Sequence, residues 1–444
     1  PRRRRFGVSS FGISGTNAHV IIEEPPTPEN ASTNESPVVA ELPVVPLLAS
    51  ARSEQALTEQ ITRLQAVNAP PLDVAFTAAT TRTHLEHRAV VLPRATITGR
   101  TDTGRTAIMF TGQGAQRINM GAGLHEVFPV FAHTFDQCCT HFDDLLGPGL
   151  RDALTDPDTL DHTQWTQPAL FSLEVALYRL TESLGIQPDY LIGHSIGELA
   201  AAHIAGVWSL QDACTFVAAR ARLMGSLPPG GAMMSVTATT GEITPLLPET
   251  VAIAAVNAPR SLVLSGPAAE LDALQTQLTD AGLTTRRLHV SHAFHSPLME
   301  PILTELHQTA TTLTYSPPQI PIISNLTGAI LTDTQATSPD YWVNHVRQTV
   351  HFAQGITTLT DAGVTHYLEL GPDPVLCTLT PDNTLAAPAL RRRRDDTETF
   401  LTMLAHAHTH GVNINWTTLF AGRGATKVDL PTYPFEHRTY WLTP

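Results

Sequence analysis

A short stretch, residues 191–198, has the sequence LIGHSIGE and limits the possible folds of this chain more than any other segment. An apolar run, Tyr190-Leu191-Ile192, precedes it, and a segment rich in helix formers, residues 199–205, follows it. A strand, a Gly-x-Ser-x-Gly turn and a helix in this order are typical of a nucleophile elbow, in which small residues permit a sharp turn that exposes the serine. The helix directs its first amides toward that hydroxyl, which suits an oxyanion. The stretch therefore predicts a nucleophile at Ser195, with a helix N-cap as the alternative role.

Length, charge and cysteine content limit the class of protein. A chain of 444 residues is too long for one compact core, and we expect roughly two to four units. Its 27 basic and 41 acidic side chains give a net charge of −14, which disfavours nucleic acid as the main partner. No apolar run is long enough to span a membrane, and no signal peptide is recognised. The cysteines lack metal-ligand spacing and are expected to be free thiols of a cytoplasmic protein: Cys138, Cys139, Cys214 and Cys377.

The N-terminal part is predicted to be a domain remnant followed by a linker. In residues 6–24, small residues precede the β-branched run Val20-Ile21-Ile22, which predicts a strand with nothing before it to pair with. We interpret this region as the tail of a domain that continues upstream, in which His19 would be catalytic only together with the rest of that domain. Residues 25–46 are rich in Pro, Glu, Ser and Asn, a composition typical of a linker.

Residues 45–92 are predicted to form a small α/β unit. Strands are expected at residues 46–49 and 88–92, and helices at residues 53–64 and from Asp73 onward. Because no residue pattern in this unit indicates chemistry, its expected role is that of a spacer or a docking platform.

A second glycine-rich loop, Gly112-Gln113-Gly114, follows an apolar run that predicts a buried strand at residues 107–110. The Gly-x-Gly spacing suggests a dinucleotide site, but Arg117 occupies the position of the third glycine. We therefore expect the loop to present a main-chain amide to a cleft, and a simple tight turn is the alternative.

The middle of the chain is predicted to hold an inserted unit. A helix is expected to open at Pro168, and a second helix at residues 210–224 carries Arg220. After a Pro-Pro-Gly-Gly break at residues 228–231, three strands, a helix and a strand are predicted within residues 232–290. This order indicates a small antiparallel α+β insertion, after which the chain returns to an α/β layer.

A serine nucleophile needs a base, and histidine has the pKa that suits neutral pH. His194 adjoins Ser195, but neighbours on an elbow point in different directions, so it is a poor base. His295 is the better candidate because it lies among turn-forming residues at the end of a predicted strand. His292, three residues earlier, lies in the same turn.

Together these motifs resemble the acyltransferase domain of modular polyketide synthases, a family related to bacterial malonyl-CoA:acyl carrier protein transacylase. The spacing of the motifs agrees with that family, and the resemblance covers nearly the whole chain. It is carried by Gly112-Gln113-Gly114, Gly193-His194-Ser195-Ile196-Gly197-Glu198, Arg220 and His292-Ala293-Phe294-His295, and by the C-terminal residues 430–437 with Tyr440-Trp441.

The resemblance implies four segments and a fold class. Residues 1–30 correspond to the C-terminal remnant of a ketosynthase domain and residues 31–104 to the ketosynthase–acyltransferase linker domain. Residues 105–390 correspond to the acyltransferase domain and residues 391–444 to the post-acyltransferase linker. The implied fold is α/β, a large α/β-hydrolase-like subdomain with an inserted small ferredoxin-like α+β subdomain at about residues 230–298, plus the small α/β linker domain.

The family also implies a role for each matching residue. Ser195 attacks the acyl thioester and holds the acyl group, and His295 is its base. The main-chain amides of Gln113 and Ile196 form the oxyanion hole. Arg220 pairs with the free carboxylate of the substrate, since the guanidinium fork meets a carboxylate in two parallel hydrogen bonds. The family needs no acid to orient His295, and a backbone carbonyl near Asn344–His345 is expected to serve.

Four pocket residues are implied to set substrate choice: His194, Ile196, His292 and Phe294. Malonyl-using members of the family carry His-Ala-Phe-His and an aliphatic residue after the nucleophile, as this chain does. Phe294 would occupy the space that the extra methyl group of a methylmalonyl unit needs. We therefore expect malonyl-CoA as the substrate, with no metal and no bound cofactor.

The implied partners are an acyl carrier protein, through its phosphopantetheine thiol, and the ketosynthase domain of the same polypeptide. No nucleic acid and no membrane is expected as a partner, and without the ketosynthase the protein is expected to be a monomer. Because carrier proteins are commonly acidic, residues 391–394, four consecutive arginines, are a candidate docking patch, although a solvated face is the alternative.

Two other function classes remain open. An α/β-hydrolase is also built on Gly-x-Ser-x-Gly, but it would need an acid between Ser195 and His295 in the chain and would have no use for Arg220. A non-catalytic scaffold that docks neighbouring domains would have no use for the serine and the histidine.

Overall fold

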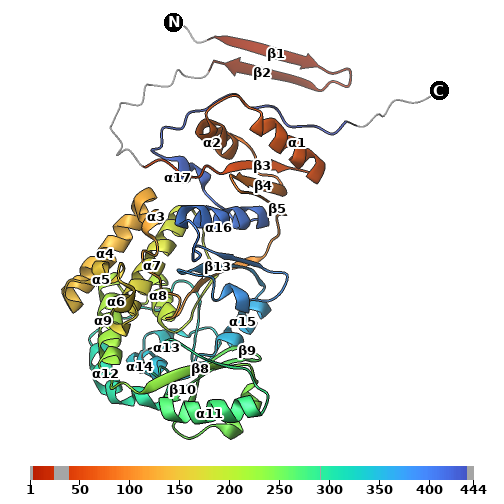
Figure 1. Cartoon of the computed structure of the whole chain (residues 1–444). Coiled ribbons are helices and arrows are strands. Elements are labelled where there is room, and N and C mark those ends of the chain that lie inside the picture. Colours follow the sequence, from red (N-terminus) through yellow and green to blue (C-terminus); the bar gives the residue numbers. More distant parts are fainter. Residues whose placement is uncertain (1–3, 25–39, 291, 438–444) are drawn as a thin grey trace. The chain divides into compact units, whose positions relative to one another are not determined.

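The chain divides into two compact units, Pro1–Val38 and Val39–Pro444, and the computed structural model describes residues 4–24, 40–290 and 292–437. In the first unit, β1 (Arg5–Phe11) and β2 (Asn17–Glu23) form an antiparallel hairpin (Figure 1). The expectation that nothing pairs with the second strand is therefore wrong. The glycine and the two serines of Arg5–Phe11 weaken its strand pattern, so the sequence did not predict this strand. A turn with Gly15 at φ 87° joins the two strands. Most of the expected linker, residues 25–39, lies outside the described residues.

The second unit begins with a three-stranded antiparallel sheet of order β3-β4-β5. Its helices α1 and α2 pack on β3, and Ser53 caps α1 by accepting a hydrogen bond from the Ala56 amide. The predicted strands and helices are confirmed, but β5 is an element that the sequence did not reveal. The elements are β3 (Leu47–Ala51), α1 (Glu54–Gln65), α2 (Pro71–Thr81), β4 (His87–Leu92) and β5 (Ala95–Arg100).

A five-stranded parallel sheet of order β12-β7-β6-β13-β14 forms the middle of the unit (Figure 1). Residues 107–110 of β6 are fully buried, as expected for a parallel strand with helices over both faces of the sheet. The strands are β6 (Arg105–Phe110), β7 (Tyr190–Gly193), β12 (Ile322–Ile323), β13 (Val364–Leu370) and β14 (Leu385–Pro388).

Helices surround this sheet, and one of them differs from the prediction. The helix expected to open at Pro168 begins at Thr163, because proline lacks only the amide that would reach the Gln164 carbonyl and otherwise holds a helical φ. The helices are α3 (Ala122–Val127), α4 (Pro129–Leu146), α5 (Leu150–Ala153), α6 (Pro157–Leu160), α7 (Thr163–Ser183), α8 (Ile196–Ile204), α9 (Leu210–Gly225), α12 (Leu303–Ala310), α13 (Asp333–Ala336), α14 (Pro339–Arg347), α15 (Phe352–Asp361) and α16 (Asp396–His410). A further helix, α17 (Trp416–Phe420), packs on α2.

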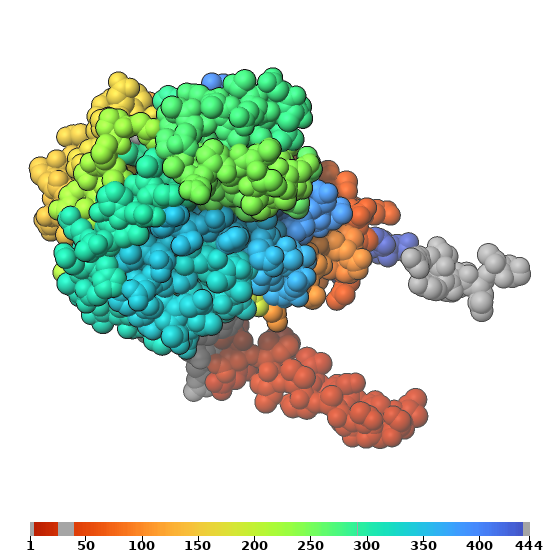
Figure 2. Space-filling view, turned by 90° about the horizontal axis from the view of Figure 1, so that it is seen from below, coloured from red at the N-terminus to blue at the C-terminus, as the bar shows by residue number. Residues whose placement is uncertain are grey.

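The predicted insertion forms a separate four-stranded sheet of order β11-β8-β10-β9, antiparallel throughout. It is covered by α11 and makes the green lobe of Figure 2. This lobe has its own apolar core, in which Leu271, Leu274 and Leu278 of α11 pack on the sheet. The elements are β8 (Gly231–Val236), α10 (Thr240–Ile243), β9 (Ala252–Ala258), β10 (Ser261–Pro267), α11 (Ala268–Asp280) and β11 (Thr285–Arg287).

The C-terminal segment returns to the three-stranded sheet unit. The Val428 amide donates to the Thr77 hydroxyl at 3.0 Å, and the Arg52 amide donates to the Tyr433 hydroxyl at 3.0 Å. Tyr440 and Trp441, two residues of the expected post-acyltransferase motif, lie outside the described residues. Among the helices that the structure describes, none is long and apolar enough to cross a membrane.

Candidate active site

The turn between β7 and α8 presents Ser195 in a strained conformation. Its φ of 53° and ψ of −112° lie in a sparsely populated region, which costs about 1–3 kcal/mol for a residue with a side chain. The glycines beside it are needed for space: a Cβ on Gly193 would lie 2.0 Å from the Glu198 amide nitrogen, and one on Gly197 would lie 2.3 Å from the Phe110 carbonyl oxygen. The local sequence therefore builds the predicted sharp turn.

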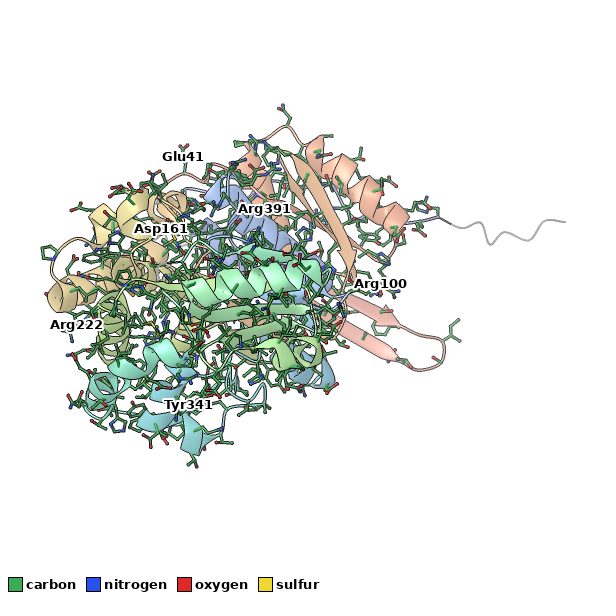
Figure 3. All side chains as sticks on the ribbon, turned by 60° about the horizontal axis from the view of Figure 1, so that its bottom comes forward. Glu41, Arg100, Asp161, Arg222, Tyr341 and Arg391 are labelled. Atoms are coloured by element: carbon green, nitrogen blue, oxygen red, sulfur yellow. The ribbon has the colours of Figure 1, made fainter. Side chains whose placement is uncertain are left out.

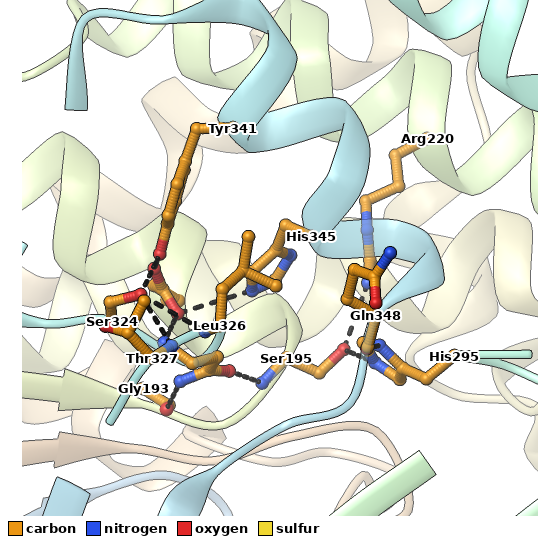
Figure 4. A network of polar contacts seen from close by, with 12 residues as sticks. Gly193, Ser195, Arg220, His295, Ser324, Leu326, Thr327, Tyr341, His345 and Gln348 are labelled. Carbon is orange, nitrogen blue, oxygen red and sulfur yellow. Dashed lines mark hydrogen bonds and ion pairs between the residues drawn. The ribbon is translucent and has the colours of Figure 1, made fainter. Parts of the chain in front are cut away.

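His295 lies in hydrogen-bond reach of Ser195 although the two are distant in the chain (Figure 4). The Ser195 Oγ is 2.8 Å from His295 Nε2, and His295 Nδ1 is 2.9 Å from the Gln348 carbonyl oxygen. A carbonyl can only accept, so Nδ1 carries the proton and Nε2 is free to accept the serine proton. The expected carbonyl near Asn344–His345 is instead that of Gln348, because α14 ends at Arg347 and the next residue turns its carbonyl toward the imidazole.

The environment keeps His295 neutral. Burial lowers its pKa well below the usual value of 6.5, and the charges of His345 and Arg220 act in the same direction. A neutral imidazole is the form that can accept a proton from serine. His194 makes a different contact, with its Nε2 2.9 Å from Asn257 Oδ1, and burial also lowers its pKa.

Two main-chain amides are available near the serine. Within the described residues, the amides of Gln113 and Ile196 make no hydrogen bond. The Ile196 amide is at the first position of α8, where a helix leaves its N–H groups unpaired. Gln113 lies in the loop after β6, which lines the same cavity as Ser195. Two such donors can stabilise a developing oxyanion.

Arg220 projects from α9 to the serine and is 2% exposed. Its Nη2 donates to Ser195 Oγ at 3.0 Å, its Nη1 donates to Gln167 Oε1, and its Nε is buried without a partner in the described structure. No carboxylate of the described residues pairs with it. Burial lowers its pKa to about 9, so the guanidinium is still charged at neutral pH. A buried cation without an anion is costly, which makes this position a strong anion site.

A cavity of about 690 Å³ brings these groups together. Of the four expected pocket residues, His194 and Phe294 line it and the other two do not. The His292 Nε2 lies 3.0 Å from the Leu227 carbonyl, in the turn after α9, and the Ile196 side chain is fully buried in the main core. The cavity lining includes Gly112, Gln113, Gln167, His194, Ser195, Arg220, Met233, Ser235, Ala255, Asn257, Val263, Arg286, Phe294, His295, Val375 and Leu376.

Sequence reasoning missed four residues that contact the site: Gln167, Asn257, Asn325 and Gln348. Asn325 was open to prediction, because it follows β12, which pairs in parallel with the elbow strand β7. Neighbouring parallel strands end at the same edge of a sheet, so residues after each strand meet there. The other three have no spacing signal relative to Ser195. In the described part of the chain, no group of three or more His, Cys, Asp or Glu side chains could hold a metal ion.

Two family models match the chain. The model described as acyl transferase domain covers residues 108–414, and the model described as ketoacyl-synthetase C-terminal extension covers residues 1–92. A phenolphthiocerol synthesis polyketide synthase type I, Pks15/1 of Mycobacterium marinum, is 44% identical over all of this chain. Polyketide synthase GfsA of Streptomyces halstedii is 41% identical over 99% of it. The chain spans only 23% and 6% of the lengths of these two relatives.

Solved structures agree with these matches. The acyltransferase domain from the second module of the salinomycin polyketide synthase is 45% identical, with a TM-score of 0.75 over 89% of this chain and 100% of that one. The acyl transferase domain of ZmaA has a TM-score of 0.82 at 27% identity, over 88% of this chain and 100% of that one. FabD from Acinetobacter baumannii is 29% identical, with a TM-score of 0.62 over 68% of this chain and 99% of that one.

Proposed function

The chain belongs to the acyl transferase domains of modular type I polyketide synthases, and we propose that it loads a malonyl extender unit from malonyl-CoA onto Ser195 and transfers it to the phosphopantetheine thiol of an acyl carrier protein. The contacts of Ser195 with His295 and Arg220 support this substrate and this mechanism.

The proposed reaction has two half-reactions of the ping-pong type. In the first, His295 Nε2 takes the Ser195 proton as Oγ attacks the thioester carbonyl, and then gives that proton to the leaving thiolate. In the second, the thiol of the carrier protein attacks the serine ester, and His295 transfers the proton in reverse. The amides of Gln113 and Ile196 would hold the oxyanion in both, and one such donor contributes about 2.7–4 kcal/mol to transition-state stability.

The observation that carries the substrate assignment is the unpaired guanidinium of Arg220. Its Nη2 reaches the nucleophile, and its Nε has no partner among the described residues. An acyl group with a free carboxylate would neutralise this charge close to the reacting carbonyl, whereas an acetyl group would leave it unpaired. A dicarboxylic acyl group is therefore preferred.

The choice of malonyl over methylmalonyl is argued from Phe294. It is 7% exposed and lines the cavity next to His295 in the chain. An aromatic ring here leaves less room for a methyl group on the α-carbon. One methyl group changes such discrimination by about 1–3 kcal/mol, so some acceptance of methylmalonyl is expected.

A hydrolase of the triad type is less compatible with this site. The group that orients His295 is the Gln348 carbonyl, and no carboxylate of the described residues contacts its Nδ1. A triad would place an acid at that nitrogen.

The flanking segments are assigned by the same proposal. We assign residues 1–30 to a ketosynthase remnant, 31–104 to the linker domain, 105–390 to the acyltransferase domain and 391–444 to the post-acyltransferase linker. The ketosynthase of the same polypeptide and an acyl carrier protein are the proposed partners, and polyketide antibiotic biosynthesis is the proposed context. We also class the four-stranded sheet as ferredoxin-like and the five-stranded body as α/β-hydrolase-like.

Intact-mass measurement tests the proposed function. Protein incubated with malonyl-CoA should gain the mass of one malonyl group, and Ser195→Ala protein should gain none. Wild-type protein that gains no malonyl group, or a Ser195→Ala variant that gains one, would overturn the proposal.

A further inference from the structure

The strained turn at Ser195 needs a restraint that the glycines do not supply. Gly193 and Gly197 leave room for the turn, since added Cβ atoms would collide with backbone there, but they do not hold it. A backbone at φ 53° and ψ −112° relaxes unless the surrounding structure fixes it. A restraint on the peptide that joins His194 to Ser195 would fix the φ of Ser195.

The side-chain amide of Asn325 makes that contact. Its Oδ1 accepts a hydrogen bond from the Ser195 amide at 2.8 Å, and its Nδ2 donates to the Gly193 carbonyl at 2.7 Å. The two contacts fix the orientation of the amide, because a reversed amide would set donor against donor and acceptor against acceptor. Asn325 is 1% exposed, so water does not compete for these bonds.

A buried carboxylate keeps Asn325 in place. The Glu198 Oε2 accepts a hydrogen bond from the main-chain amide of Asn325 at 2.7 Å, and its Oε1 accepts one from the Tyr341 hydroxyl. Glu198 lies in the first turn of α8, so the loop after β12 is tied to the helix that follows the nucleophile. Asn325 therefore contacts the Ser195 turn through its side chain and the helix after the turn through its main chain.

We propose that Asn325 is a positioning residue, which holds the Ser195 turn so that Oγ is aimed at His295 Nε2, with Glu198 fixing Asn325 in turn. The inference rests on the proposed function, because its readout is acylation of Ser195. Asn325 itself touches no reacting atom. Removing it leaves the cavity wall and Arg220 in place, so the rate of acylation should fall while substrate binding is retained.

The first test compares Asn325→Ala with Tyr341→Phe in single-turnover acylation by malonyl-CoA. Tyr341→Phe is the matched control, because it removes a partner of the same buried Glu198 without touching the Ser195 turn. We expect Asn325→Ala to acylate on the order of 10²-fold more slowly, since small displacements of a nucleophile have effects of this size. The KM for malonyl-CoA should stay within about twofold of the wild-type value, because the substitution leaves the substrate-binding contacts in place.

A second variant separates positioning from folding. Asn325→Asp keeps the shape of the side chain, and its protonated form can accept from the Ser195 amide and donate to the Gly193 carbonyl. The groups facing it are Glu198 of α8, and Tyr341 and His345 of α14 beyond Glu198. The acylation rate of Asn325→Asp relative to wild type should rise as pH falls from about 8 to about 5.5, whereas that of Asn325→Ala should stay flat.

The outcomes are distinguishable. Wild-type protein that forms no ester refutes the proposed function. If wild type forms the ester and Asn325→Ala matches its rate, the positioning role is refuted. It is also refuted if Asn325→Ala and Tyr341→Phe lose rate and melting temperature equally, or if the Asn325→Asp ratio is flat with pH.

Discussion

The two sheets that border the cavity differ in what they supply. The parallel sheet is buried under helices on both faces, and its strand ends and following helices place Ser195, the two free amides and Arg220. The antiparallel sheet has one face on its own core and the other on the cavity. Along β8 and β10, Met234, Val236, Leu262 and Leu264 face the core, whereas Met233, Ser235, Ser261 and Val263 line the cavity.

This difference follows from the period of two in a strand. A sheet with one face in a core and the other toward a cavity can change its cavity side chains without losing that core. The parallel sheet has helices on both faces. Only residues at its strand ends, or in the segments that follow them, can therefore reach the cavity. We infer that the first sheet supplies the nucleophile, the two amides and the anion site. The second sheet shapes the acyl pocket, and the segment after it supplies both Phe294 and the base His295.

Replacement of Arg220 should have the largest effect on substrate preference. We expect Arg220→Ala to lower kcat/KM for malonyl-CoA relative to acetyl-CoA on the order of 10²–10³-fold, because two charge-assisted hydrogen bonds to the substrate carboxylate are lost. Competition of the two thioesters for Ser195, read by intact mass, measures this ratio.

The matched control is Arg222→Ala on the same helix. Arg222 lies at the outer surface, where it pairs with Glu305 at 3.1 Å (Figure 3). Arg222→Ala should leave the ratio of kcat/KM for malonyl-CoA to kcat/KM for acetyl-CoA unchanged. An Arg220→Ala variant that still prefers malonyl as wild type does would show that the cation has no part in selection.

Replacement of Phe294 should change pocket shape rather than chemistry. We expect Phe294→Ala to raise the rate with methylmalonyl-CoA relative to malonyl-CoA by about tenfold, within the 1–3 kcal/mol that one methyl group is worth. Acylation by malonyl-CoA itself should change little. If both substrates slow equally and their ratio is constant, the division of roles between the two regions fails.

The smallest expected effect is a shift in the pH profile. Because the pKa of His295 is lowered well below 6.5, the base stays neutral as pH falls through 6.5, and acylation should decline only at distinctly lower pH, where the imidazole becomes protonated. Single-turnover rates between about pH 4.5 and pH 8 measure this fall in the acylation rate. An apparent pKa at or above 6.5 would contradict a buried neutral base.

Local pattern predicted the parts of the site that are built locally. The strand, the turn around Ser195 and the following helix were evident because Gly193 and Gly197 are required at fixed positions beside the nucleophile. The antiparallel insertion was evident from the order of its predicted elements, three strands, a helix and a strand, after a Pro-Pro-Gly-Gly break. His295 was a candidate from its place among turn-forming residues, whereas the role of Arg220 came only from the family resemblance.

Some contacts between distant segments could not be predicted from the sequence. The carbonyl that orients His295 belongs to Gln348, and no side-chain pattern marks a carbonyl. The sequence also does not show in which direction a side chain points. For this reason His292 and Ile196 were expected at the pocket wall, which neither of them lines. The hairpin strand Arg5–Phe11 was missed because its glycine and serines mask its alternation.

Competition among three thioesters for Ser195 tests whether Arg220 and Phe294 select the acyl group. Protein given malonyl-CoA, methylmalonyl-CoA and acetyl-CoA in equal amounts, and stopped before the acyl groups equilibrate, carries on Ser195 whichever group it prefers. The unpaired guanidinium of Arg220 and the ring of Phe294 together predict a malonyl ester as the main product, with methylmalonyl as a minor one. A main product of methylmalonyl would contradict the role of Phe294, and a main product of acetyl would contradict the anion site itself.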